Sequence, residues 1–170
     1  MVDTDEYWIC ARTRFNQEIS IREMLEKEGV QYFIPTCRKI QKFKTCLRET
    51  EKAVIPNLIF FKTSWSKAFS LLTLSGGKMN YIRLRDKKIL TIPEDQMDAF
   101  MRLIDEMKEQ VVILPECYAL GDRVVIKSGN LAGMEGILTE IDGKNRFVIT
   151  LGSLLSASVR IPKSNLLKLK

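Results

Sequence analysis

The last fifty residues constrain the fold most strongly, because they combine strand-forming runs with frequent turn residues and show no helical pattern. The runs are RVVI, ILTEI, RFVIT and SVRI, and turns such as Asp142-Gly143 separate them. β-Branched residues are good strand formers and poor helix formers. The pattern therefore predicts a small antiparallel β-barrel over residues 120–170.

The loop between the first two runs reads KSGNLAGMEG, residues 127–136, and contains three glycines. A barrel with so few strands must bend sharply at its corners, and glycine reaches positive φ at little steric cost. We expect Gly129 to form a tight turn, Gly133 to allow a close backbone contact, and Gly136 to kink the chain as it enters the next strand.

The first 110 residues mix strand and helix patterns. The first part predicts a strand over 6–13, a helix over 16–29 with Asn16 as its N-cap, and a strand over 30–37. A basic hairpin or loop is predicted next, over 38–52. The remainder predicts a strand over 53–63, a helix over 64–77, a strand over 79–88 and a long helix ending at 110. This succession favours an α+β domain with an antiparallel sheet flanked by helices. Residues 111–119 are predicted to be a linker.

Composition argues against several classes of function. The chain has no histidine, and Cys10, Cys37, Cys46 and Cys117 form no CxxC pair. Reduced thiols in or near the core are therefore expected, with no metal, no cofactor and no Ser/His or Cys/His catalysis. SGGK, residues 75–78, is too short for a phosphate-binding P-loop. The sequence thus predicts a binding protein and not an enzyme.

Charge and hydropathy give weaker indications. The net charge is +6, with +2 on the first 117 residues and +4 on the remainder, which is compatible with nucleic-acid contact. No apolar run approaches the ~18 residues of a membrane span. The acidic start MVDTDEYW lacks the features of a signal peptide, so a cytoplasmic protein without membrane association is expected.

Six segments of the chain match, in order, the pattern of one protein family. GDRVVIKSGNLAGMEGILTEID, residues 121–142, resembles the KOW motif, although Asn130 stands where proline is usual. EYWICARTRFNQE, YFIPTCRK, AVIPNLIFF, YIRL and IPEDQMDAFM resemble consecutive segments of the NusG N-terminal domain, with Ile55 and Leu58 at positions that are usually aromatic. The segments occur in the family's order, from Glu6 to Leu169, and most resemble the specialised RfaH and UpxY groups.

The resemblance implies a NusG N-terminal domain over residues 1–110, the linker over 111–119, and an SH3-like KOW barrel over 120–170. It also implies a monomeric transcription antitermination or elongation factor that binds RNA polymerase and suppresses pausing or termination. At its narrowest, it implies action on capsular polysaccharide operons. The alternative is a ribosome-associated KOW protein that binds RNA, which would explain the barrel and the charge but not the N-terminal domain.

The resemblance also assigns candidate residues. An apolar pocket for RNA polymerase is implied at Ile55, Leu58, Phe60, Tyr81, Met97 and Phe100. Phe60 and Phe100 fit a core position as well as an interface, whereas Leu58 and Tyr81 are expected to form an exposed apolar patch. Contact with the non-template DNA strand is implied at Arg14, Asn16, Gln17 and Arg22, for which an ordinary solvated surface is the other interpretation.

The barrel carries two further assignments. Gly129, Gly133 and Gly136 are implied to be the KOW glycines. Leu154 and Leu155 correspond to the area that meets ribosomal protein S10 or the termination factor Rho in the family, and barrel core is the alternative for both leucines. We also expect the C-terminal domain to be β in the free protein, because six glycines would interrupt a helical hairpin. Only the tail SNLLKLK has a composition compatible with a short helix.

Overall fold

The computed structural model describes residues 5–42, 47–107, 110–114 and 121–169. The chain forms two compact units, Met1–Ile92 and Pro93–Lys170, called here the first unit and the second unit. The elements of the first unit are β1 (Tyr7–Thr13), α1 (Glu18–Lys27), β2 (Gln31–Phe33), β3 (Thr36–Lys42), β4 (Leu47–Ala53), β5 (Leu58–Thr63), α2 (Trp65–Leu74), β6 (Met79–Tyr81) and β7 (Thr91–Ile92).

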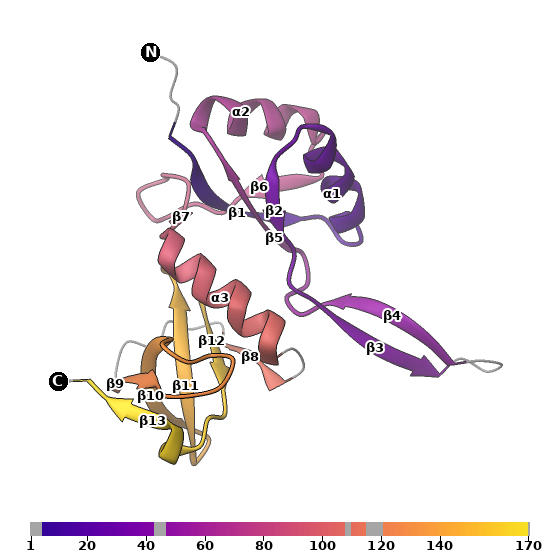
Figure 1. The fold of residues 1–170 in the computed structure, drawn as a ribbon. Helices are drawn as coiled ribbons and strands as arrows, with labels where there is room; N and C mark the ends of the chain where they lie inside the picture. The colour runs from indigo at the N-terminus through magenta and orange to yellow at the C-terminus, as the bar shows by residue number, and fades with distance from the viewer. Residues whose placement is uncertain (1–4, 43–46, 108–109, 115–120, 170) are drawn as a thin grey trace. The chain divides into compact units, whose positions relative to one another are not determined.

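The first unit is built on an antiparallel sheet with strand order β2-β5-β1-β6, and β7 also pairs with β1. Helices α1 and α2 cover one face of this sheet (Figure 1). Alternate strand residues point to that face. The core there contains Ile9, Ala11, Ile21, Leu25, Val30, Ile59, Phe61, Ala68, Leu71, Met79 and Tyr81.

The starts of the two helices differ from each other. Helix α2 begins after Ser64, whose hydroxyl accepts a hydrogen bond from the Lys67 N–H at 3.4 Å. Helix α1 begins one residue later than predicted, because Gln17 is the N-cap and makes no side-chain cap bond. Asn16 instead has φ +58°, a left-handed turn conformation that asparagine adopts more readily than most residues.

Strands β3 and β4 form a two-stranded hairpin that pairs with no other described strand. The sequence allows either a hairpin or a loop for the basic segment 38–52, and the structure has a hairpin there. At its base, the Val54 N–H donates to the Pro35 carbonyl oxygen at 2.7 Å. The hairpin projects away from the sheet of the first unit (Figure 1).

The second unit consists of an antiparallel β-sheet and one long helix. Its elements are α3 (Glu94–Met107), β8 (Val112–Leu114), β9 (Asp122–Ile126), β10 (Glu135–Ile141), β11 (Lys144–Leu151), β12 (Leu155–Val159), a short 3₁₀ helix (Lys163–Asn165) and β13 (Leu166–Lys168). The six strands are antiparallel in the order β13-β9-β10-β11-β12-β8. Helix α3 packs on β11 and buries Met97, Phe100, Leu103 and Ile104.

These elements confirm the predicted fold class, an α+β sheet region with a second, all-β antiparallel part. Several other details differ from the prediction. Val112–Leu114, inside the predicted linker, forms β8 because this β-prone run pairs with β12. The tail forms a 3₁₀ turn and β13, which pairs with β9. The compact units divide after Ile92, which groups α3 with the second unit, and the family-type domain limits stay a prediction.

Candidate functional site

A groove of about 440 Å³ lies beside the start of α1. Its lining residues, which define the α1 groove, are Phe15, Asn16, Glu18, Ile19, Arg22, Ile34, Thr36, Ala53, Pro56 and Asn57. Two of the four predicted DNA-contact residues, Asn16 and Arg22, are therefore brought to one surface feature. Sequence analysis missed Phe15 and Ile19, which are 78% and 61% exposed.

Backbone hydrogen bonds hold the turn that carries Phe15. The Arg14 N–H donates to the Lys78 carbonyl oxygen at 2.8 Å, and the Gln17 N–H donates back to the Arg14 carbonyl at 3.1 Å. Across the groove, the Asn57 N–H donates to Glu18 Oε1 at 3.1 Å. The exposed ring of Phe15 therefore projects from a backbone that is tied at several points.

Positive charge is concentrated in the first unit. Residues 1–92 contain 17 basic and 10 acidic side chains, a net charge of +7, whereas residues 93–170 contain 10 basic and 11 acidic side chains, a net charge of −1. Arg14 is exposed and Arg22 is half-buried, and within the described chain neither guanidinium has a hydrogen bond or ion pair. Both are available to an external anion.

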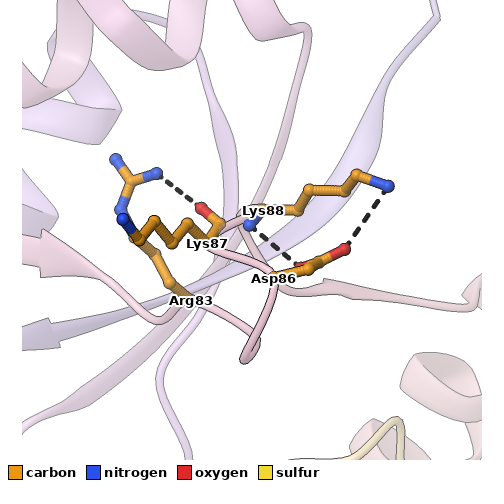
Figure 2. Close-up of polar contacts among 4 residues, drawn as sticks. All are labelled: Arg83, Asp86, Lys87 and Lys88. Carbon is orange, nitrogen blue, oxygen red and sulfur yellow. Dashed lines mark hydrogen bonds and ion pairs between the residues drawn. The ribbon is translucent and has the colours of Figure 1, made fainter.

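A second basic feature is the turn between β6 and β7, residues 83–88, called here the basic turn (Figure 2). Arg83 Nη1 donates to the Lys87 carbonyl oxygen at 2.9 Å, and the Lys88 N–H donates to Asp86 Oδ1 at 3.1 Å. The Lys88 N–H is the main cause that lowers the pKa of Asp86 below its ordinary value. Arg85 and Lys87 are exposed, and their side chains have no partner within the described residues.

The residues predicted to form the polymerase pocket come from several elements and from both units. Leu58 and Phe60 point to the face of the first unit's sheet opposite α1 and α2, because Ile59 and Phe61 lie in the α1/α2 core. Ile55 is half-buried before β5. Met97 and Phe100 lie on the buried side of α3, in the second unit.

Tyr81 lies on the other side of the sheet from Leu58 and Phe60. It pairs with Ala11 across β1 and β6, belongs to the α1/α2 core, and donates from its hydroxyl to the Ala68 carbonyl oxygen at 2.6 Å. Burial raises the pKa of this phenol. The expected exposed patch of Leu58 and Tyr81 is therefore wrong: the two side chains are only 5% and 8% exposed and point in opposite directions.

The glycine loop of the second unit, residues 127–136, shows why its glycines are needed. Gly129 and Gly133 have φ +87° and +82°, and Gly129 forms the expected turn, with its carbonyl accepting from the Ala132 N–H at 3.0 Å. The close approach expected at Gly133 occurs at Gly136 instead. A Cβ on Gly133 would meet nothing within 4 Å, whereas one on Gly136 would lie 2.6 Å from Phe147 Cζ and 2.7 Å from the Val148 carbonyl oxygen.

Helix α3 holds the tip of the glycine loop through polar contacts. Arg102 Nη2 donates to the carbonyl oxygens of Asn130 and Ala132, at 2.5 and 3.2 Å, and the Asn130 amide donates to Glu106 at 2.6 Å. Elsewhere in the second unit, Leu155 is buried in β12, which fits the core alternative, and Leu154 is half-buried in the preceding turn.

The described residues include a free thiol and no candidate metal site. No group of three metal-ligating side chains is close enough to hold a metal ion within the described ranges. Cys10 is a free thiol, and burial raises its pKa, with Arg12 opposing that effect. Cys37, Cys46 and Cys117 lie outside the residues whose side chains are described. No helix of the described chain is long and apolar enough to cross a membrane.

Comparison with known proteins assigns the fold to transcription factors. The family model described as "Transcription termination factor nusG" matches residues 6–101, more than half of the chain. The chain therefore belongs to the NusG family, whose members are transcription factors and are not known as enzymes. Among curated protein sequences there is no match.

Two solved structures are similar along nearly the whole chain. The structure titled "Domain interaction in Thermotoga maritima NusG" is 18% identical, with a TM-score of 0.52 and coverage of 99% of both chains. The structure titled "Crystal Structure of MjSpt4:Spt5 complex conformation B" is 15% identical, with a TM-score of 0.29 and coverage of 95% of this chain and 96% of that one. At this identity the first comparison supports the fold and nothing finer.

Proposed function

We propose that this chain is a transcription elongation factor that binds RNA polymerase and suppresses pausing or termination. The observation that carries the proposal is the family match over residues 6–101. Such a factor needs no catalysis, because it shifts the polymerase toward the elongating form by binding that form more tightly than the paused form. Antitermination of capsular polysaccharide operons is the narrowest version of the proposal.

Among the residues predicted for the polymerase pocket, we propose Ile55 as the contact, because it is half-buried, whereas Leu58 and Phe60 are 5% and 0% exposed. Met97 and Phe100 are fully buried, and Tyr81 is a core residue with a hydrogen-bonded hydroxyl, so these three are not retained. The proposed DNA contact is the surface at the start of α1, with Arg14, Asn16, Gln17 and Arg22. The net charge of +7 on the first unit supports attraction to a polyanion.

The alternative, a ribosome-associated RNA-binding protein, assigns RNA binding to the C-terminal barrel. The net charge of +4 on residues 118–170 is compatible with it, because RNA binding draws most of its affinity from basic side chains on phosphates, but this alternative leaves the family match over residues 6–101 unexplained. For a protein partner such as S10 or Rho, we propose Leu154 as the more accessible of the two predicted leucines.

Affinity purification of the tagged chain tests the function directly. RNA polymerase subunits are expected to co-purify, and recovery of ribosomal subunits alone would favour the alternative. In single-round transcription with the RNA polymerase that co-purifies, the purified chain is expected to shorten the duration of pauses. Ile55→Asp is expected to weaken polymerase binding. Trp8 and Trp65 both lie in the first unit, so their fluorescence reports whether this variant is folded. A folded Ile55→Asp variant that still binds polymerase would contradict the proposed contact.

A further inference from the structure

The α1 groove contains an exposed aromatic ring that the proposed function leaves unexplained. Phe15 is 78% exposed, and Ile19, four residues later in the first turn of α1, is 61% exposed. Both belong to the 440 Å³ groove, so they form one apolar surface and not two isolated exposed side chains. Contiguous exposed apolar surface usually marks a binding site.

The surroundings of the ring favour a nucleobase over an apolar segment of a protein. Arg22 lines the same groove, and Arg14 precedes Phe15 in the chain. Asn16 and Asn57 add amide groups that can donate to and accept from base edges. The one acidic group in the lining is Glu18, and one of its oxygens already accepts from the Asn57 N–H. This combination of flat ring, amides and guanidinium is typical of single-strand binding sites.

The backbone geometry places the ring for stacking. Asn16 has φ +58° directly after Phe15, and the Gln17 N–H bond to the Arg14 carbonyl closes the turn around it. Because the ring stands on a hydrogen-bonded turn, little backbone freedom would be lost when a base stacks on it.

We infer that Phe15 is a stacking platform for one unpaired base of the non-template DNA strand, which the α1 groove receives while Arg22 contacts an adjacent phosphate. The inference rests on the proposed function for its ligand and adds residues that the family resemblance does not assign. Stacking recognises the flat face of any base, so Phe15 supplies affinity, and Asn16 and Asn57 supply whatever base preference exists.

Binding of the full-length chain to a labelled single-stranded DNA 12-mer, followed by fluorescence anisotropy, tests the inference without polymerase. Phe15→Ala is expected to weaken binding by about 5-fold to about 100-fold, the range that loss of one stacked base gives. Phe69→Ala is the matched control, because Phe69 on α2 is 60% exposed in the same unit and lies outside the groove. It is expected to bind as the wild type does.

The salt dependence separates stacking from charge. Phe15→Ala should lower affinity at every salt concentration and leave the slope against log[salt] unchanged, because no phosphate contact is lost. Arg22→Ala should reduce that slope by about 0.7 for one lost contact to a single strand. Phe15→Trp should restore binding, and 2-aminopurine in the oligonucleotide should be quenched by the wild type and less by Phe15→Ala.

Several results would overturn the inference. The first is that Phe15→Ala and Phe69→Ala bind the DNA with equal affinity, and the second is that Phe15→Ala changes the salt slope. The third is that the wild type does not bind the DNA. The fourth is that the wild type and its variants bind an RNA of the same sequence more tightly than the DNA. Loss of polymerase binding by Phe15→Ala with unchanged DNA binding would identify the groove as a protein-docking surface. Failure of the proposed function looks different, because the wild type would then bind the oligonucleotide but not polymerase.

Discussion

The two units are both built on antiparallel strands, yet they use glycine and charge differently. The three glycines of the first unit, Gly29, Gly76 and Gly77, follow the ends of α1 and α2, where an added Cβ would meet no atom closer than 3.7 Å. The six glycines of the second unit lie in its strands and tight turns. The first unit also has a net charge of +7 and the second −1. The second unit therefore relies on close backbone packing, and the first unit carries the surface suited to a polyanion.

The largest expected effect tests where the core of the first unit lies. Tyr81→Asp should unfold this unit, because it places a carboxylate in the α1/α2 core at a cost of several kcal/mol. Tyr81→Phe is the control and should cost about 1 kcal/mol, the value of one buried hydrogen bond. Urea unfolding followed by tryptophan fluorescence measures both variants. A folded Tyr81→Asp variant that loses only polymerase binding would restore Tyr81 to the interface.

The next effect tests the close packing of the second unit. Gly136→Val should lower its free energy of unfolding by about 3 kcal/mol or more, because the new side chain would overlap the Phe147 ring and the Val148 carbonyl. Gly133→Ala has open space, and only its φ of +82° opposes the substitution, so about 1–2 kcal/mol is expected. Amide resonances of β10 and β11 during denaturation report both. Equal losses in the two variants would refute the close-approach role of Gly136.

A smaller effect tests the charge difference between the units. Replacing Arg85 and Lys87 of the basic turn with alanine should flatten the salt dependence of DNA binding by at most about 0.7 per lost phosphate contact to a single strand. Lys144→Ala and Lys163→Ala in the second unit form the matched pair, because both lysines are exposed there. The same anisotropy titration gives both slopes. A larger change for the second pair would reverse the proposed division of roles.

The smallest effect concerns the pH response of the basic turn. Asp86 has a lowered pKa, so its bond to the Lys88 N–H is present above the ordinary aspartate pKa and is lost as pH falls through the lower folded value. The Lys88 amide resonance should therefore shift with a midpoint below that of an unperturbed aspartate. Asp86→Asn should remove this shift. A midpoint at or above the ordinary value would show that the turn does not hold the carboxylate as in Figure 2.

The sequence predicted elements whose signal is local. Helix α3 follows from the spacing of Met97, Phe100 and Ile104, whereas the sequence left the cap of α2 open between Ser64 and Ser66, of which Ser64 is the observed cap. Short strands such as β7 and β13 were missed, because two or three residues carry no periodicity and form only where a partner strand is available. Local pattern therefore predicts long elements, and tertiary pairing decides the short ones.

The candidate site was less predictable, because the face to which each side chain points depends on strand register and turn geometry. The side of the sheet on which Tyr81 lies depends on the pairing of β6 with β1, and a shift by one residue would reverse it. The exposure of Phe15 depends on the turn at Asn16, and an apolar residue before a helix packs inward just as readily. The sequence signal that was present is the Arg-Phe-Asn run itself, a basic, an aromatic and an amide residue side by side.

The β3–β4 hairpin has a consequence for how this family member can diverge. Its strands bond only to each other within the described sheets, and no strand of the first unit's main sheet relies on them for its register. Insertions or deletions of whole residue pairs in the hairpin would therefore leave the folding of α1, α2 and their sheet intact. The length and composition of the hairpin are therefore free to vary between relatives. Selection can change which partner surface the hairpin contacts at little cost in the free energy of folding.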